Sequence, residues 1–356
     1  MNDLSIRQRI ALELNRRLKD TRRKEHTLRQ LFWECTWRCN LSCRHCGSDC
    51  KSSSTLPDMP AADFLRVVDS LLPHVDPHIL NVIITGGEPL VRDDIEYVGR
   101  QLYDRKMPWG IVTNGLLLTP GRLESLRAAG LHNITISLDG LEEDHNWMRN
   151  HPKSFARAYE AIRMTARASD LNFDVVTCVN RRSLPRLTEL KELLIEAGVK
   201  GWRLFTIFPA GRAADYPEFK LTKGEIETLM RFIADTRKEG RIKASFCCEG
   251  FMGSYEGIVR DNFFECQAGV TVGSVLLDGG IGACPSIRAD YRQGNIYEDD
   301  FWDVWQNRFG QYRDRSWMRR GVCADCRFWR YCEGNGMHLR DSRGDLMHCA
   351  ISISNE

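Results

Sequence analysis

The segment that decides the fold is Leu31-Phe-Trp-Glu-Cys-Thr-Trp-Arg-Cys-Asn-Leu-Ser-Cys-Arg-His-Cys46, which contains Cys39-x3-Cys43-x2-Cys46. Three thiolates within eight residues can bind one face of a metal cluster. No fourth ligand at matching spacing completes the tetrahedron that a structural zinc site normally requires. Cys35 and Cys50 flank the three cysteines but do not fit the spacing. The pattern indicates a cluster with one open metal position, and a buried structural group of cysteines is the alternative.

The chain after this segment alternates between two kinds of pattern. Short apolar runs with many β-branched residues are typical of buried parallel strands, and amphipathic helical patterns lie between them. We expect strands over 31–37, 81–86, 109–114, 133–138, 173–180 and 202–209. Helical patterns lie between them, for instance over 61–72, 93–103, 121–129, 154–168 and 184–197. Six strand–helix units with right-handed crossovers predict an α/β fold, a partial (β/α)6 barrel that is TIM-like but open on one side.

Three parts of the chain differ in pattern. Residues 1–30 hold nine Lys/Arg against four Asp/Glu and are predicted to form a basic helical extension. Its basic residues between 16 and 24 are expected to form a solvated helix face, with contact to an acidic partner as the alternative. Residues 31–240 form the predicted barrel. After about Arg241 the alternation fades and Cys and Gly increase, so 241–356 is predicted to be a cysteine-rich extension.

Polar residues follow the second, third and fourth predicted strands, and in parallel barrels chemistry lies at the carboxyl ends of strands. The second strand ends in Thr85-Gly86-Gly87-Glu88-Pro89. Two glycines let the backbone approach a ligand, and Glu88 can accept a hydrogen bond from an ammonium group. The third strand ends in Thr113-Asn114-Gly115 and the fourth in Ser137-Leu138-Asp139-Gly140. These polar side chains suit hydroxyl and carboxylate groups, so the sequence predicts a ligand site at this edge of the sheet.

The cysteine segment and the Gly-Gly-Glu-Pro motif together resemble the radical S-adenosylmethionine (SAM) enzymes. The resemblance implies that Cys39, Cys43 and Cys46 ligate a [4Fe–4S] cluster whose fourth iron is free to bind SAM. It also implies that the reduced cluster cleaves SAM, and that the 5′-deoxyadenosyl radical then abstracts a hydrogen atom from a substrate. An external electron donor of the flavodoxin or ferredoxin type is implied as well.

The same resemblance suggests which residues contact SAM. The motif ending in Glu88 would hold the methionine amino group. Ser137 and Arg149 match the spacing of a serine that binds the nucleoside and an arginine that binds the carboxylate, and the planar fork of Arg suits a carboxylate. For Arg149 a surface ion pair is the alternative, and for Asp139 ribose binding and turn capping both stay open. The remaining candidates are Asn114 for polar groups of SAM, and Ile207 and Phe208 for the adenine side or the plain core.

The C-terminal region resembles the SPASM extension, whose seven-cysteine pattern ligates two auxiliary iron–sulfur clusters. Six of the seven positions match, namely Cys266, Cys284, Cys323, Cys326, Cys332 and Cys349. The seventh is Gly336. By this resemblance the last four cysteines form a complete outer site, for which zinc is the alternative because two close cysteine pairs also suit zinc.

The inner site leaves several arrangements open. It could have three protein ligands and an open iron, with Cys247 or Cys248 as the upstream ligand. It could take His338 as a replacement ligand, or be absent. Cys323 and Cys326 could instead join Cys266 and Cys284, as in the shorter twitch variant of the domain. The sequence therefore predicts one or two auxiliary iron–sulfur clusters.

The substrate class is predicted from the resemblance alone. SPASM-bearing enzymes mostly modify peptides or proteins, so a peptide or protein maturase is the leading prediction. A radical SAM enzyme acting on a small molecule or tetrapyrrole is the alternative, and a non-enzymatic metal-binding protein is the third class. Pro285 follows Cys284 where formylglycine-forming relatives have aspartate, which counts against that reaction. The segments 35–39 and 332–341 also resemble a group found beside small lipoproteins in Bacteroidales-type bacteria.

Composition restricts partners and compartment. A net charge of +2 favours neither nucleic acid nor a membrane as the main partner. No run approaches the ~18 apolar residues of a membrane span, and the N-terminal stretch lacks the apolar core of a signal peptide. We therefore expect a cytoplasmic protein, in which the fourteen cysteines are more often metal ligands than disulfides.

Overall fold

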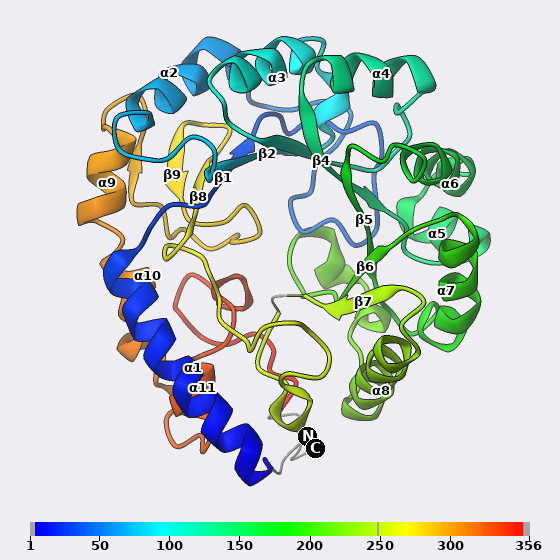
Figure 1. Ribbon diagram of the computed structural model, residues 1–356. Helices are drawn as coiled ribbons and strands as arrows, with labels where there is room; N and C mark the ends of the chain where they lie inside the picture. Colours follow the sequence, from blue (N-terminus) through cyan, green and yellow to red (C-terminus); the bar gives the residue numbers. More distant parts are fainter. Residues whose placement is uncertain (1–3, 248, 352–356) are drawn as a thin grey trace.

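The centre of the molecule is a mostly parallel ten-stranded sheet that curves into an open barrel (Figure 1). The computed structural model describes residues 4–247 and 249–351, and the strand order is β10-β9-β8-β1-β2-β3-β4-β5-β6-β7. The strands are β1 (Gln30–Glu34), β2 (Asn81–Thr85), β3 (Trp109–Thr113), β4 (Leu131–Ser137), β5 (Asn172–Cys178), β6 (Gly201–Phe205), β7 (Lys243–Phe246), β8 (Val272–Val275), β9 (Gly280–Gly282) and β10 (Gly294–Asn295).

Helices cover the outer face of this sheet (Figure 1). Those between the parallel strands are α2 (Ala61–Leu71), α3 (Ile95–Asp104), α4 (Pro120–Ala128), α5 (Glu142–Arg149), α6 (Ser154–Thr165), α7 (Leu187–Glu196) and α8 (Lys223–Glu239). The others are α1 (Ile6–Glu25) before β1, and α9 (Phe301–Asn307), α10 (Gly310–Arg313) and α11 (Trp329–Cys332) in the C-terminal region. None of the helices in the described ranges is long and apolar enough to cross a membrane.

The core lies between the sheet and the outer helices. In several of the parallel strands the residues that are buried include large aromatic side chains. Trp33 of β1 stacks on Phe64 of α2 with ring centroids 4.5 Å apart, and Trp109 and Trp202 are each 0% exposed. Because both faces of a parallel strand are covered, such strands need near-continuous apolar runs, which is why the sequence pattern located them.

The predicted α/β open barrel is confirmed. Strands β1–β6 and helices α2–α4, α6 and α7 form where the sequence predicted them, and the sheet does not close. The sheet extends further than the six predicted units. Helix α8 and strand β7 add a parallel strand next to β6, and β8 pairs in parallel with the other side of β1. These short, Gly- and Ser-containing strands lack the apolar runs that mark β1–β6, and they carry the sheet across the predicted boundary at residue 240.

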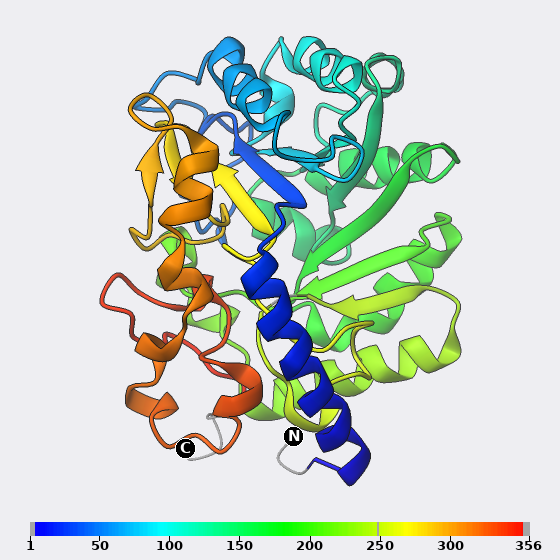
Figure 2. The same ribbon diagram turned by 60° about the vertical axis from the view of Figure 1, so that its left-hand side comes forward.

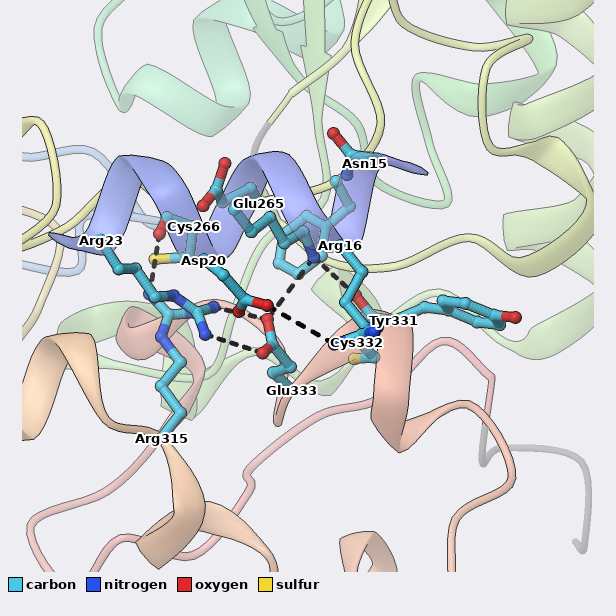
Figure 3. A network of polar contacts seen from close by, with 12 residues as sticks. Asn15, Arg16, Asp20, Arg23, Glu265, Cys266, Arg315, Tyr331, Cys332 and Glu333 are labelled. Atoms are coloured by element: carbon cyan, nitrogen blue, oxygen red, sulfur yellow. Dashed lines mark hydrogen bonds and ion pairs between the residues drawn. The ribbon is translucent and has the colours of Figure 1, made fainter. Parts of the chain in front are cut away.

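The expectation that the basic residues of α1 form a solvated helix face is wrong, because some of them are buried against the rest of the protein. The helix lies along the outside of the molecule beside the C-terminal region (Figure 2). Lys19 is only 3% exposed and donates to the Tyr331 carbonyl at 2.6 Å. Arg23 forms a two-bond pair with Glu333 at 2.7 and 2.5 Å. Helix α1 thus fastens the N-terminus to the segment that carries Cys332 (Figure 3).

Candidate active site and auxiliary metal sites

The three-cysteine loop lies directly after β1, at the carboxyl edge of the sheet. Cys39 and Cys43 are buried and Cys46 is half-buried, and they pack with Leu41 and Cys50. Backbone bonds fix the loop at both ends. The Cys39 N–H donates to the Lys51 carbonyl at 2.7 Å, and the Cys46 carbonyl accepts from the Arg212 N–H at 3.0 Å. The predicted ligand triplet is therefore one preformed group.

The thiols of this loop influence one another. Burial raises the pKa of Cys39 to about 12, and Cys43 and Cys46 contribute to that rise. Burial also raises the pKa of Cys43, with Arg149 opposing it. Hydrogen bonding from the Cys50 thiol lowers the pKa of Cys46 to about 5 despite burial, and Arg212 assists. Thiolates are the form that binds metal, so the nearby arginines favour ligation over free thiols.

Residues outside the triplet take different places. Cys35 is fully buried in the main core, and its carbonyl accepts from Arg92 at 2.8 Å. Cys50 lies beside Cys46 but off the x3, x2 spacing. The guanidinium of Arg212, from the Pro-x-Gly-Arg segment after β6, donates to the Cys43 carbonyl at 2.7 Å and to the Cys50 carbonyl at 3.0 Å. The segment after β6 thus contains an arginine that holds the cysteine loop in place, a role that the sequence did not indicate.

The two glycines after β2 are required by the cysteine loop itself. A Cβ on Gly86, at φ +146, would lie 2.3 Å from the Thr36 carbonyl oxygen, and one on Gly87 would lie 2.2 Å from that of Arg38. Instead the Gly87 N–H donates to Thr36 at 2.7 Å and the Glu88 N–H donates to Arg38 at 3.0 Å. The glycines let two backbones approach each other, which differs from the predicted close approach to a ligand.

Glu88 is buried and already accepts three hydrogen bonds from the chain. Oε2 accepts from the Asn114 N–H at 2.8 Å, and Oε1 accepts from Thr113 Oγ1 at 2.8 Å and from the Leu90 N–H at 3.1 Å. Burial raises the pKa of Glu88, and these donors partly oppose the rise. A carboxylate offers about four acceptor positions, so one remains for a ligand. Glu88 also orients Asn114, whose side-chain amide lies 3.9 Å from the Cys39 Sγ.

Asp139 and Arg149 form a buried ion pair next to the cysteine loop. Arg149 Nε donates to Asp139 Oδ2 at 2.6 Å, and its Nη1 lies 3.9 Å from the Cys43 Sγ. The Cys178 N–H donates to the other carboxylate oxygen at 3.0 Å. Burial alone would raise the pKa of Asp139, but Arg149 and two histidines lower it to about 2. Neither expected role of Asp139, ribose binding or turn capping, included this pair, and Arg149 at 8% exposed is no surface residue.

The side chains of His45, Cys178 and Ser137 complete this part of the site. The ligand atoms of His45, Asp139 and Cys178 lie within 4.8 Å of one another. Cys178 ends β5, and Ser137 ends β4, where it is 9% exposed. The sequence could have indicated His45, between two ligand cysteines, and Cys178, at a strand end. The Nδ1 of His45 is a buried polar atom without a hydrogen-bond partner among the described residues, and a bound polar ligand would satisfy it.

His145 holds the backbone of Asp139 in place and so supports the Asp139–Arg149 ion pair. Its Nδ1 accepts from the Asp139 N–H at 3.0 Å, so in the neutral ring the Nε2–H faces Ser154 Oγ at 3.0 Å. Burial lowers the pKa of His145 to about 3. Neutral His145 therefore fixes the turn after β4 that presents Asp139 to Arg149.

The residues proposed for the adenine side contact other parts of the protein. Ile207 packs against the small apolar group of Met148, Ala213 and Phe219. The Phe208 ring lies edge-on to the His338 imidazole, with centroids 5.2 Å apart. Phe208 thus bridges the β6 loop and the C-terminal region. Burial lowers the pKa of His338 to about 4, which leaves a neutral ring.

The auxiliary cysteines lie in two groups. Burial raises the pKa of Cys332 to about 12, with Cys349 and Cys323 contributing, and the pKa of Cys323 in turn rises through burial and through Cys349 and Cys326. The four outer-site cysteines are therefore neighbours. Burial, with Cys266 contributing, raises the pKa of Cys284 to about 11. This grouping favours the outer quartet over the twitch arrangement.

The inner group has fewer candidate ligands close at hand. Cys247 is half-buried and interacts with Arg203, and Cys248 lies outside the described residues. Gly336 precedes a short 3-10 turn at Met337–Leu339 and supplies no ligand. Figure 3 shows Arg23 of α1 reaching Glu333 next to Cys332, and Arg315, which follows α10, donating to the Cys266 carbonyl at 2.7 Å. Arg22 also pairs with Glu265 at 2.9 Å.

The open barrel with a three-cysteine loop after β1 defines the class of protein. The radical SAM superfamily model matches residues 33–193, and an iron–sulfur cluster-binding domain, SPASM, matches residues 266–327. The chain is therefore a radical SAM enzyme with a C-terminal SPASM domain. This class binds a [4Fe–4S] cluster and SAM, and the SPASM domain binds auxiliary iron–sulfur clusters.

The chain is similar along most of its length to several named enzymes and solved structures. The chain is 29% identical over 341 residues to an AdoMet-dependent heme synthase of Methanosarcina barkeri, covering 90% of this chain and 94% of that protein. It is 27% identical over 312 residues to the mycofactocin maturase MftC of Mycolicibacterium smegmatis, covering 86% and 77%. Among solved structures, Streptococcus suis SuiB bound to SAM has a TM-score of 0.70 at 19% identity, covering 98% of this chain and 84% of that one. Native anSMEcpe with bound AdoMet has a TM-score of 0.68 at 18% identity, covering 89% and 91%.

Proposed function

We propose that the protein cleaves SAM at a cluster held by Cys39, Cys43 and Cys46 and uses the resulting radical to modify a polypeptide. When bound, the [4Fe–4S] cluster supplies the electron that breaks a C–S bond of SAM. The observation that carries the proposal is the arrangement of this buried triplet beside the Asp139–Arg149 pair. The predicted site residues converge there from four strand ends.

The chain's own residues divide the work of holding SAM. The Arg149 guanidinium would meet the carboxylate of SAM, because Asp139 holds it through Nε and leaves the Nη groups toward Cys43. The free acceptor position on Glu88 would take the ammonium group, and Ser137 and Asn114 would meet hydroxyls. The barrel has to exclude water and hold the reacting C–H near the radical carbon, which is a positioning task.

The support for a polypeptide substrate is the charge of the site. Four arginines on or next to the strands that carry the site each have a carboxylate partner within this chain. These pairs are Arg149–Asp139, Arg203–Asp174, Arg212–Asp49 and Arg288–Glu34. Apart from Arg149, whose Nη groups stay available to SAM, these guanidinium groups are already compensated by their carboxylate partners, which suits a polypeptide better than a substrate with several carboxylates. The mycofactocin maturase among the relatives and the complex of SuiB with its precursor peptide SuiA agree with this choice.

A tetrapyrrole substrate is the second candidate. The heme synthase relatives favour it, because the similarity spans nearly their whole length. The two candidates differ in the charge they require at the site, and the pairing of Arg203, Arg212 and Arg288 with carboxylates is the reason to place the polypeptide first.

The test is a paired assay under anaerobic conditions. Reconstituted protein receives SAM, a strong reductant and either small proteins encoded beside its gene or Fe-coproporphyrin III, and products are read by mass spectrometry. A mass change in a polypeptide that is absent with Cys39, Cys43 and Cys46 changed to Ala supports the proposal. Conversion of the porphyrin with all polypeptides unchanged contradicts it and favours the second candidate.

A further inference from the structure

Arg340 is a buried cation that has no carboxylate partner among the described residues. It is 1% exposed and belongs to the largest fully buried side chains of the molecule. The nearest acidic residues along the chain are engaged elsewhere, since Asp341 pairs with Arg343 and Asp345 with Arg320. Among the described residues no carboxylate forms an ion pair with Arg340. Burying an unpaired charge is costly, so such groups are normally paired or bound to an anion.

The guanidinium of Arg340 points at a cysteine of the outer auxiliary quartet. Its Nη2 lies 3.3 Å from the Cys323 Sγ, within hydrogen-bond distance for sulfur. The remaining donors meet backbone carbonyls, Nε and Nη2 at Gly334 (3.1 and 2.9 Å) and Nη1 at Gly344 (2.7 Å). These neutral acceptors satisfy the hydrogen bonds, but within the described part of the chain no carboxylate compensates the positive charge.

The surrounding segment is shaped to hold Arg340 in this position. Gly334 has φ +86, and a Cβ there would lie 2.9 Å from Arg340 Nη2. Gly344, whose carbonyl accepts from Nη1, also has a positive φ of +81. Burial raises the pKa of the Cys323 thiol, and Arg340 is the main opposing influence. The local fold therefore directs a fixed positive charge at one sulfur.

We propose that Arg340 compensates the charge of the iron–sulfur cluster held by Cys323, Cys326, Cys332 and Cys349 and raises its reduction potential. A [4Fe–4S] core with two positive charges and four thiolates is doubly negative, and one-electron reduction adds a further negative charge. A fixed cation and a hydrogen bond to a ligand sulfur both stabilise the reduced form more than the oxidised form. Arg340 thus makes this cluster a better acceptor of a substrate electron. The inference rests on the proposed ligand set, but not on the substrate.

The experiment isolates the auxiliary sites. Cys39, Cys43 and Cys46 are changed to Ala so that the SAM cluster is absent, and Arg340→Gln, Arg340→Lys and Arg313→Gln are made in this background. Arg313 is the matched control, because its guanidinium also binds backbone carbonyls of the C-terminal region, those of Gly269, Gln306 and Trp305. Iron is counted, and the midpoint potential is read from the reduced-cluster EPR signal during titration with a chemical reductant.

Arg340→Gln is expected to lower the reduced-to-oxidised ratio of one cluster at least tenfold at fixed potential. For a one-electron couple this corresponds to a fall of about 59 mV in the midpoint potential. The Lys variant keeps the charge and should lie nearer to the parent, and Arg313→Gln should match the parent. Selective loss of iron from the Gln variant while the Lys variant keeps it also supports charge compensation. Unchanged potentials in both Arg340 variants, or equal iron loss from both, would overturn the proposal and leave Arg340 a loop-organising residue. None of these readouts requires SAM cleavage or substrate, so the result is independent of the proposed function.

Discussion

Single side chains set the electrostatics of the site. Arg149 is held by one carboxylate oxygen of Asp139, while a backbone N–H from Cys178 holds the other oxygen. The pair is buried, so each member needs the other, and removing one leaves an uncompensated charge. This arrangement presents a preorganised arginine to a ligand next to the cysteine loop.

Arg149→Lys should weaken SAM binding by about 1–3 kcal/mol, because Lys keeps the charge but loses the planar fork that meets a carboxylate in two bonds. The dissociation constant of SAM for the reconstituted protein is the measurement. Arg44→Lys, an exchange in the cysteine loop where Arg44 donates to Asn150, serves as the control and should bind SAM as the parent does. Equal affinity in the Arg149 variant would show that this residue contributes only to folding.

His145 makes the stability of the protein depend on pH. Its folded pKa of about 3 lies below the ordinary value of 6.5, so the unfolded chain binds more protons between these values. The stabilisation is complete above about pH 6.5 and is lost as the pH falls toward 3. Between pH 7 and 5 the free energy of unfolding of the metal-free protein should fall less steeply in His145→Gln than in the parent. The two slopes should differ by at most about 1.4 kcal/mol per pH unit. Parallel curves for variant and parent would contradict the buried neutral ring.

At the scale of elements, helix α1 packs against the C-terminal region and stabilises its position. Its face toward the C-terminal region carries Lys19, Arg22 and Arg23, which contact Tyr331, Glu265 and Glu333 respectively. Figure 3 shows Arg23 beside Glu333. These contacts lie beside Cys332 and Cys266. A helix that looks like a solvated basic extension in sequence is therefore part of the framework around two candidate metal sites.

Lys19→Met should destabilise the metal-free protein by about 1–3 kcal/mol, because the buried Tyr331 carbonyl loses its donor. Arg17→Met, on the exposed face of the same helix, should change stability by no more than about 0.5 kcal/mol. Urea unfolding followed by tryptophan fluorescence measures both variants. Similar effects from the two substitutions would mean that the inward face of α1 contributes no specific stabilisation.

The sequence predicted the elements that are covered on both faces better than the short strands at the ends of the sheet. Strands β1–β6 are covered on both faces, so their apolar runs marked them, and the strand-end motifs then located the site. Strands β7–β10 are short and contain small residues, so no such run marked them. The Lys19 contacts join residues about three hundred positions apart, and Asp139 and Arg149, though only ten positions apart, lie on different elements. No spacing pattern predicts which carboxylate a given cation meets.

At the scale of the whole molecule, the radical SAM barrel and the SPASM region share one sheet. Strands β8–β10 extend it beyond β1, and β7 extends it beyond β6. Phe208 and His338 add a contact between the β6 loop and the C-terminal region. The auxiliary sites and the cysteine loop are thus held on one framework.

The auxiliary region should hold one complete cluster. With Cys39, Cys43 and Cys46 changed to Ala, the reconstituted protein should retain about four irons per chain, because the quartet has four thiolates and the inner group lacks a ligand at Gly336. About eight irons would mean that the inner cluster forms on fewer protein ligands. Zinc in place of iron, or no metal, would contradict the assignment of the quartet.

The central claim is that the triplet Cys39, Cys43 and Cys46 holds the cluster that cleaves SAM. The most direct measurement is the formation of 5′-deoxyadenosine and methionine from SAM by the anaerobically reconstituted protein with a strong reductant, read by chromatography. We predict that the parent protein forms both products and that the variant with all three cysteines changed to Ala forms neither. Product formation at the parent rate in that variant would contradict the account.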